Sequence, residues 1–282
     1  MNLNIENYHS AEANAEYMSN SQYGNFMDCP AQAVAKLAGY DSAPKACFEV
    51  GGYIDINLLT PEEYPAWFAR HHGALVETGC LSKRDSTKKN APLVLADQMI
   101  ARAKADPVFM QYLVGDHQKM YTFEFGGVMW RGALDVFNLD LKRIVDLKST
   151  KSIVDMEWTD FRTIYDTIEE NTPFNHKVPY YVLRGYWRQL ALYRYAVEYN
   201  EGFVPECFIA AISKEKVTDI DVIQFDIEEE FQRELNDIKM NLPDVMAWKS
   251  GEKVAPRCGR CGFCRETKVL GLPSVAIGKV SK

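Results

Sequence analysis

A chain of 282 residues with 47% hydrophobic and 25% charged residues has the composition of a globular protein that buries one sizeable core. It has no apolar run of about 18 residues and no basic N-terminal region followed by an apolar stretch, so we expect a cytoplasmic protein without a membrane span or secretory signal. The net charge of −7 argues against a protein that coats nucleic acid with a basic surface, but it leaves room for an enzyme that binds phosphates locally.

The first part of the chain has patterns typical of helices. Asp28 can cap a helix that begins at Pro30, because a short acidic side chain accepts hydrogen bonds from the first helical N–H groups. Apolar residues at helical spacing, bounded by prolines, predict three more helices. These expected helices cover residues 45–58, 62–71 and 92–105.

A polar stretch at residues 82–90 separates two of these helices and has the composition of a loop. Its basic side chains are candidates for a local lining that contacts phosphates, and a solvated charged loop is the alternative. These side chains are Lys83, Arg84, Lys88 and Lys89.

The second part of the chain alternates strand and helix patterns. β-branched and aromatic residues predict three successive strands, of which the first two are joined through Gly126-Gly127. This order, continued by a helix, two strands and a closing helix, predicts one α/β domain with helices packed on a mixed sheet. The expected strands are 120–125, 128–137, 143–148, 207–212 and 217–225, and the expected helices are 179–199 and 228–248.

Two of the expected strands carry charged residues that can meet. Gly132-Ala133-Leu134-Asp135 lies on one strand and Asp146-Leu147-Lys148 on the next. Because side chains alternate across a strand, Asp146 and Lys148 share a face, and Asp135 comes alongside Asp146 if the strands form a hairpin. Such carboxylates suit a hard divalent cation, and a nearby ammonium group suits phosphodiester hydrolysis. An ordinary ion pair on a solvated face is the alternative.

The ordered pattern Gly-x-x-Asp and Asp-x-Lys resembles the PD-(D/E)xK nuclease superfamily, and within it the exonuclease VIII (RecE-like) group of phage and prophage proteins. The stretch Tyr8-His9-Ser10 is similar to the opening of that group, and it indicates fold identity with no catalytic role for His9. The resemblance covers most of the chain and implies a restriction-endonuclease-like core, with a mixed central sheet flanked by helices. Its parts would be a helical N-terminal part (1–115), a catalytic core (116–227) and a C-terminal helix with a cysteine-rich tail (228–282) of one domain.

The resemblance also implies further ligands for the metal. Asp55 follows Gly51-Gly52 on an expected helix and matches the acidic residue or histidine that relatives place there, whereas a solvated helix carboxylate is the alternative. Relatives also use the main-chain carbonyl that corresponds to Leu147. The implied cation is Mg²⁺ or Mn²⁺, held by Asp55, Asp135, Asp146 and Leu147.

The segment Gln189-Leu190-Ala191-Leu192-Tyr193 matches a Gln-x-x-x-Tyr motif of the family. A spacing of four places Gln189 and Tyr193 on one helix face, and the resemblance implies that they position the substrate beside the metal. An aromatic stripe buried in the core is the alternative, because other aromatic residues crowd the segment. These are Tyr181, Tyr186, Trp187 and Tyr195.

Three cysteines near the end of the chain, Cys258, Cys261 and Cys264, are separated by two residues each, which suits a soft metal or an iron–sulfur cluster. Three thiols are one ligand short. Some relatives, including AddB-type and CRISPR-adaptation nucleases, complete a [4Fe–4S] cluster with an N-terminal cysteine that precedes a proline, and Cys29-Pro30 matches that position. A cluster, a structural zinc ion and free thiols all stay open.

The family resemblance implies a magnesium-dependent exodeoxyribonuclease that digests linear double-stranded DNA in the 5′→3′ direction. The product would be a single strand for an annealing protein in phage-type recombination, and the enzyme, encoded by a phage or bacterium, would be a homo-oligomer. Lys148 would act on the attacking water or stabilise charge on the phosphate; we favour the second role. The alternatives are an iron–sulfur nuclease that trims DNA ends in CRISPR adaptation and a catalytically silent DNA-binding or scaffold protein.

Overall fold

The computed structural model describes residues 3–4, 7–40, 45–153, 156–160, 175–179 and 185–270. The chain divides into two compact units, one made of Met1–Asn20 and Ser42–Met240 and the other of Ser21–Asp41 and Asn241–Lys282. Whether these units form the single domain expected from the sequence stays a prediction. In the described part of the chain, every helix is too short or too polar to cross a membrane.

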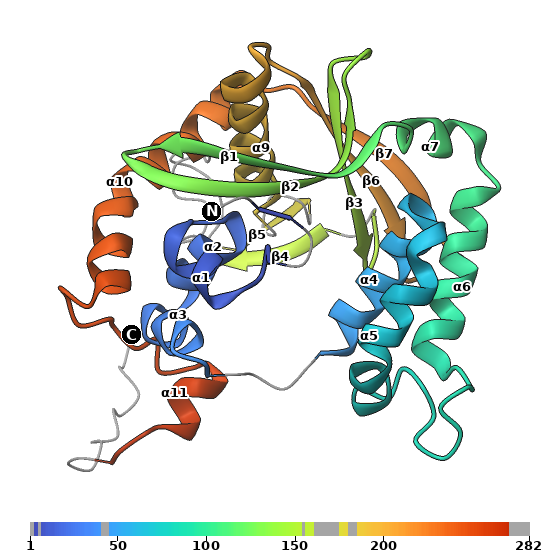
Figure 1. Cartoon of the computed structure of the whole chain (residues 1–282), viewed down its shortest axis with the longest axis horizontal. Helices are drawn as coiled ribbons and strands as arrows, with labels where there is room; N and C mark the ends of the chain where they lie inside the picture. The colour runs from blue at the N-terminus through green and yellow to red at the C-terminus, as the bar shows by residue number, and fades with distance from the viewer. Residues whose placement is uncertain are drawn as a thin grey trace, which may run out of the picture. The chain divides into compact units, whose positions relative to one another are not determined.

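A five-stranded mixed sheet lies at the centre of the larger unit (Figure 1), in the order β1-β2-β3-β6-β7. β3 and β6 are parallel, and the other neighbours are antiparallel. This sheet and its flanking helices confirm the predicted α/β fold, and each strand lies within a few residues of its expected range. The strands are β1 Asp116–Phe125, β2 Val128–Asn138, β3 Arg143–Thr150, β6 Glu206–Ser213 and β7 Ile220–Phe225.

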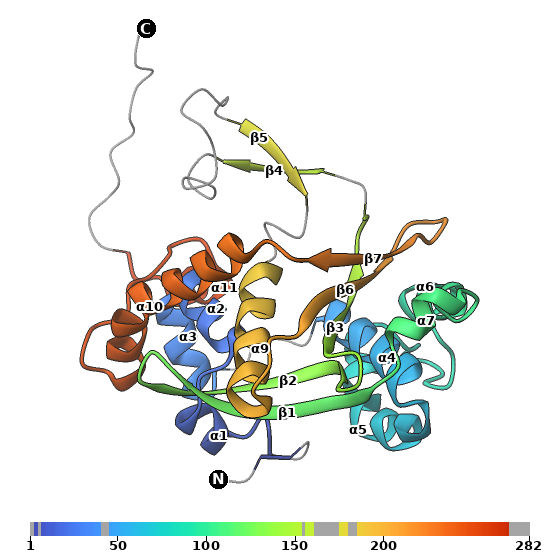
Figure 2. The ribbon, with the colours of Figure 1, turned by 90° about the horizontal axis from the view of Figure 1, so that it is seen from above.

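Helices cover both faces of the sheet at β3. α4, α6 and α7 pack on β3, β6 and β7, whereas α9 packs on β1, β2 and β6 (Figure 2). Leu147 belongs to the apolar core that α4 and α6 share with the sheet, and Asp146 points to the α9 side. The helices are α4 Ala46–Leu59, α5 Tyr64–Glu77, α6 Ala91–Lys104, α7 Pro107–Tyr112 and α9 Tyr186–Glu201, with the 3₁₀ turn η1 Pro61–Glu63 before α5.

β2 and β3 pair only at one end, through Val136 with Val145, Phe137 with Ile144 and Asn138 with Arg143. Asp135 and Asp146 come next along the two strands, so the strands separate at the acidic pair; we call this place the fork. On the far side of the fork, the N-terminal segment pairs with β2. The Met18 N–H donates to the Met129 carbonyl at 2.8 Å, and the Arg131 N–H donates to the Met18 carbonyl at 2.8 Å.

The expected helix at 179–199 is wrong at its start. Pro179 ends a strand, β5 Asn175–Pro179, which pairs antiparallel with β4 Met156–Asp160, and the helix α9 begins at Tyr186. Gly185 precedes it with a left-handed backbone (φ +68°), which an L-residue adopts only with strain, so the helix does not extend backwards through it. Residues 180–184 lie outside the described residues.

The smaller unit contains α3 Pro30–Leu37 and α11 Gly262–Glu266. Asp28, expected to cap α3, is instead the last residue of α2 Asn20–Asp28. The capping position belongs to Cys29, whose extended backbone (φ −162°, ψ 98°) makes the break before Pro30.

The remaining helices are α1 Ala11–Glu16, which was not predicted, and α10 Glu228–Ser250, which was.

Candidate active site

The fork brings Asp135, Asp146 and Lys148 together. Asp146 and Lys148 share one side of β3 and form an ion pair, as the alternation of side chains predicts. The Leu147 N–H donates to Asp135 Oδ2 at 3.0 Å, and Gln118 Nε2 donates to Asp135 Oδ1 at 3.3 Å. The carboxyl group of Asp135 is therefore held against β3, beside Asp146.

Asp55 reaches the same place from α4, on the other side of β3. Because β2 separates from β3 at the fork, the edge of β3 beyond Asp146 is not paired with β2. At this edge, Asp55 interacts electrostatically with Asp135, Lys148 and Asp146. Burial raises the pKa of Asp55 well above its usual range, and the charge of Asp135 adds to the effect. Burial and the charge of Asp146 likewise raise the pKa of Asp135 from 3.8 to about 7.

The acidic cluster, defined as Asp55, Asp135 and Asp146, has the chemistry of a divalent cation site. The charges of Asp135 and Asp146 disfavour the ionisation of Asp55, and the charge of Asp146 disfavours that of Asp135; a cation bound by these oxygens would reverse both effects. Oxygen donors of this kind fit Mg²⁺ or Mn²⁺ better than a soft metal. The donor set of the chain thus fits the cation that the sequence led us to expect.

Gln189 and Tyr193 reach the acidic cluster from α9. Gln189 Nε2 donates to Asp146 Oδ1 at 2.9 Å and to the Tyr193 hydroxyl at 3.1 Å. The ring of Tyr193 lies over Gly132, where a Cβ atom would come within 3.1 Å of the ring. The glycine of the Gly-x-x-Asp pattern therefore permits this close approach. The neighbouring Trp187 is instead a core residue, packed on Phe225 and Phe231.

Tyr8 is a neighbour of the site to which the sequence assigned no role. The backbone of Ala133 hydrogen-bonds to its hydroxyl, and Asp135 interacts with it electrostatically. The Arg131 guanidinium lies 4.7 Å from the centre of its ring. Only the tertiary pairing of the N-terminal segment with β2 brings Tyr8 here, so no local pattern could have identified it.

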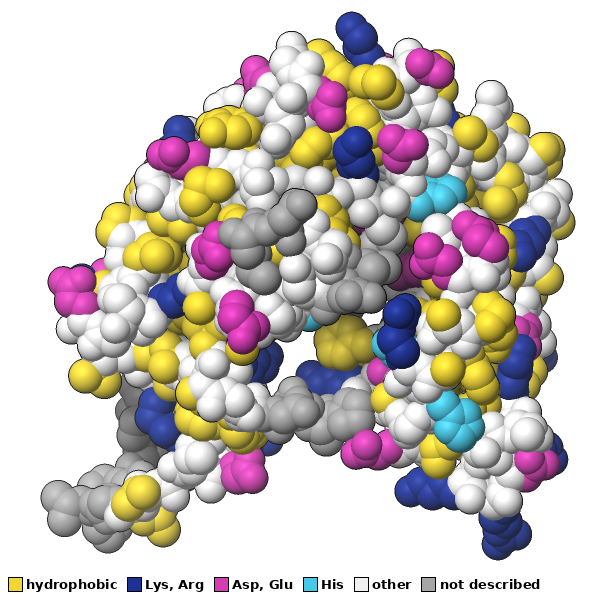
Figure 3. Space-filling model, in the orientation of Figure 1, with side chains coloured by type: hydrophobic (Ala, Val, Ile, Leu, Met, Phe, Trp, Pro, Cys, Tyr) yellow, Lys and Arg dark blue, Asp and Glu magenta, His cyan; other side chains and the backbone are white. Residues whose placement is uncertain are grey.

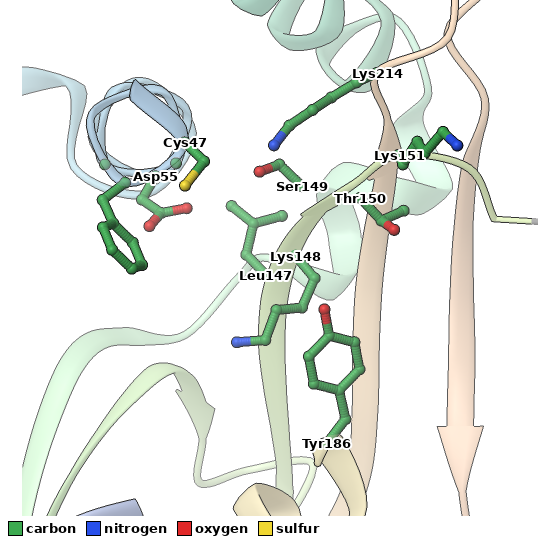
Figure 4. Close-up of a pocket in the computed structure, with 12 residues that line it drawn as sticks. Cys47, Asp55, Leu147, Lys148, Ser149, Thr150, Lys151, Tyr186 and Lys214 are labelled. Carbon is green, nitrogen blue, oxygen red and sulfur yellow. The ribbon is translucent and has the colours of Figure 1, made fainter. Parts of the chain in front are cut away.

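A cavity of about 530 Å³ adjoins the acidic cluster between α4 and the end of β3 (Figure 4). Asp55 and Lys148 line one part of it, and Ser149 and Lys214 line another. Gly51 also lines the cavity, and a Cβ atom there would meet nothing within 4 Å. Gly52 is a glycine for a different reason: a Cβ atom added there would come within 3.2 Å of the Trp67 ring on α5.

The basic loop between α5 and α6 is only partly a candidate for phosphate binding. Lys89 Nζ pairs with Asp97 Oδ2 at 2.8 Å and donates to the Tyr53 hydroxyl at 2.6 Å, which makes it part of the packing of α4 on α6. The other basic residues are exposed, and Figure 3 shows Lys and Arg side chains gathered at the tip of the loop. These exposed residues are Lys83, Arg84 and Lys88.

The smaller unit brings four cysteines together. The sulfur atoms of Cys29, Cys258, Cys261 and Cys264 all lie within 4.8 Å of one another, with Cys29 Sγ and Cys264 Sγ at 3.6 Å. N–H groups of Arg260 and Cys261 donate to the Cys258 sulfur and lower the pKa of its thiol to about 6, which favours the thiolate that binds metals. Four converging thiols fit zinc or an iron–sulfur cluster.

Known proteins resemble this chain along almost its whole length. A family model described as a PDDEXK-like domain of unknown function (DUF3799) matches residues 19–267. The crystal structure of a protein from Eubacterium rectale proposed to be an exonuclease is similar, with a TM-score of 0.85 and 28% sequence identity. The match covers 98% of this chain and 97% of that chain. No curated protein matches the sequence significantly.

Proposed function

This chain belongs to the family of PDDEXK-like domains, and from that membership we propose that it is a nuclease that hydrolyses DNA phosphodiester bonds with a divalent cation. The observation that carries the proposal is the convergence of the acidic cluster and Lys148 at the fork. The similar structure from Eubacterium rectale, proposed to be an exonuclease, supports the same class of reaction.

The acidic cluster and the main-chain carbonyl of Leu147 are the groups that would hold Mg²⁺ or Mn²⁺. A bound divalent cation supplies Lewis-acid polarisation of the phosphate and activation of the attacking water. The residues of the chain determine where the cation and the substrate phosphate would lie. Asp135 is fixed by hydrogen bonds from Leu147 and Gln118, and Asp146 by its hydrogen bond from Gln189.

Lys148 acts as an ammonium group that stabilises negative charge on the phosphate oxygens. In the protein without a cation, burial lowers the pKa of Lys148, but the charges of Asp146 and Asp135 outweigh this effect and hold the pKa above its ordinary value. A lysine that removes a proton from water needs a depressed pKa instead. The electrostatic role, which requires no such depression, is therefore the better supported one.

Gln189 and Tyr193 position the groups around the cation. Gln189 donates to one oxygen of Asp146 while Lys148 pairs with the other, so both oxygens have a fixed direction. Burial raises the pKa of Tyr193 well above its usual range, which keeps the phenol protonated. Its hydroxyl oxygen accepts a hydrogen bond from Gln189. The hydroxyl proton can then be donated in a hydrogen bond to a phosphate oxygen of the substrate.

We infer that the substrate is linear double-stranded DNA, digested in the 5′→3′ direction by a homo-oligomer that supplies single strands to an annealing protein. This finer statement rests on the resemblance to the RecE-like group. A second candidate, a nuclease that trims DNA ends in CRISPR adaptation, is favoured by the four converging cysteines. A silent scaffold is disfavoured, because binding DNA alone gives no reason to crowd three carboxylates.

The proposal is tested by incubating linear duplex DNA, labelled at its 5′ ends, with the protein and Mg²⁺ under low oxygen. We expect the 5′ label to be released from the linear duplex in short fragments, because digestion from the 5′ end removes it first, and an internally labelled circular duplex of the same sequence to persist. Lys148→Ala should slow cleavage by about 10²-fold or more, and Lys148→Arg should recover part of the rate because it keeps the charge. Linear DNA that stays intact with the wild-type protein would favour the scaffold.

A further inference from the structure

We propose that the part of the cavity beside Lys214 and Ser149 binds the phosphate next to the one that is cut. We call this part the Lys214 subsite. The inference rests on the proposed nuclease function and adds to it the residues that hold the substrate strand one nucleotide away from the reaction.

The backbone brings Lys214 beside the end of the strand that carries Lys148. Lys214 follows β6, and its N–H donates to the Thr150 carbonyl at 2.8 Å, so it lies at the end of β3. Thr150 is two residues beyond Lys148, which corresponds to about 7 Å along a strand. A nucleic acid strand carries one phosphate per nucleotide, so a strand with a phosphate at Lys148 places the next one within reach of Lys214.

Within the described ranges of the chain, the ammonium group of Lys214 has no carboxylate partner. Lys214 is half-buried, and it forms no ion pair with any residue that the structure describes. Burial lowers its pKa, as expected for an ammonium group that has lost part of its hydration without gaining an anion. Among the described residues that line the cavity, Asp55 is the only carboxylate, and it belongs to the acidic cluster.

The side chains at the subsite point into the space that a phosphate would occupy. Figure 4 shows the Lys214 amine directed towards Ser149 and Cys47, whereas the Lys151 side chain points away. The Ser149 hydroxyl supplies a second donor for phosphate oxygens. The volume of about 530 Å³ holds a group of nucleotide size, and Gly51 keeps the α4 wall open. The subsite therefore has space, a cation and a neutral donor.

The test compares Lys214→Gln with Lys216→Gln, an exposed lysine two residues further on that does not line the cavity. The affinity for a fluorescent single-stranded oligonucleotide is measured by anisotropy at several salt concentrations, with Ca²⁺ in place of Mg²⁺. We expect Lys214→Gln to weaken binding about five- to tenfold and to reduce the slope of log affinity against log salt by about 0.7, the value for one phosphate contact on a single strand. Lys214→Arg should restore both. Lys214→Gln values equal to those of Lys216→Gln would overturn the proposal.

Cys47 provides an independent measurement without any substitution at Lys214. Its thiol is exposed and lines the cavity, whereas Cys80 and Cys207 are buried. We expect the oligonucleotide to slow alkylation of Cys47 at least fivefold, followed by mass spectrometry, and an unchanged rate would count against the subsite. These results are distinct from a failure of the proposed function. If the protein shows the Lys214 effects on binding but cleaves no DNA, the phosphate subsite is supported and the nuclease activity is contradicted.

Discussion

At the fork, three carboxylates lie around the ammonium group of Lys148, so the site without a cation carries excess negative charge. The protein answers this in two ways. Hydrogen bonds from Leu147 and Gln118 favour the charged form of Asp135, whereas burial and neighbouring negative charge raise the pKa of Asp55 and of Asp135 and favour their protonated forms. Ionisable residues whose charged form lowers the stability of the metal-free protein are typical of a site that binds a ligand.

This imbalance gives Asp135→Asn a predictable effect on stability. Because the pKa of Asp135 rises from 3.8 to about 7 on folding, the folded state binds a proton more tightly than the unfolded state. The stability of the metal-free wild type should therefore fall as the pH rises from about 4 to about 7. Asp135→Asn removes this loss, so with a chelator at pH 8 the variant should melt at a higher temperature than the wild type.

Thermal denaturation between pH 5 and 8, with and without Mg²⁺, checks this expectation. Mg²⁺ should stabilise the wild type and have little effect on Asp135→Asn, because binding to the folded state alone raises stability. Parallel pH dependences of the two proteins in chelator would show that Asp135 is not crowded by Asp146.

At the scale of elements, the strands could be predicted from the sequence, but the fork, where β2 and β3 separate, could not. β2 and β3 follow from their β-branched and apolar residues, and alternation places Asp146 and Lys148 correctly on one face. Tyr8 and Asp55 reach the site through tertiary packing, so their approach follows from no local pattern; Asp55 could be suggested only by family resemblance. The start of α9 was missed because Pro179 can open a helix as well as end a strand.

The two glycines of α4 should respond in opposite ways to alanine. Gly51 faces open space, so Gly51→Ala should raise stability by about 0.5–1 kcal/mol through the better helix propensity of alanine. At Gly52 the new Cβ atom would meet Trp67 at 3.2 Å, and overpacking costs about 1–3 kcal/mol. Urea denaturation of the two variants measures both effects. A Gly52→Ala variant as stable as Gly51→Ala would show that Trp67 moves freely.

At the scale of the whole molecule, both sites depend on contacts between distant parts of the sequence. Cys29 and Cys264 are 235 residues apart, yet their sulfur atoms lie 3.6 Å from each other. Other contacts join the same two segments of the smaller unit, including the Ala31 N–H with the Pro256 carbonyl at 3.1 Å and the Tyr40 hydroxyl with Glu266 at 2.8 Å. The Cys-x₂-Cys-x₂-Cys spacing identified three of the thiols, and the fourth needed the resemblance.

A metal held by these thiols would contribute folding free energy on the order of 10 kcal/mol, because no preformed site exists in the unfolded chain. Cys261→Ser should therefore lose the metal and lower the melting temperature, whereas Cys47→Ser, at an exposed thiol outside the cysteine group, should change neither. Elemental analysis decides between the alternatives: iron with visible absorption indicates a cluster, and zinc without colour indicates a zinc site. If Cys261→Ser matched Cys47→Ser in metal content and melting temperature, the four thiols would be free and the smaller unit would be held by its hydrogen bonds and packing alone.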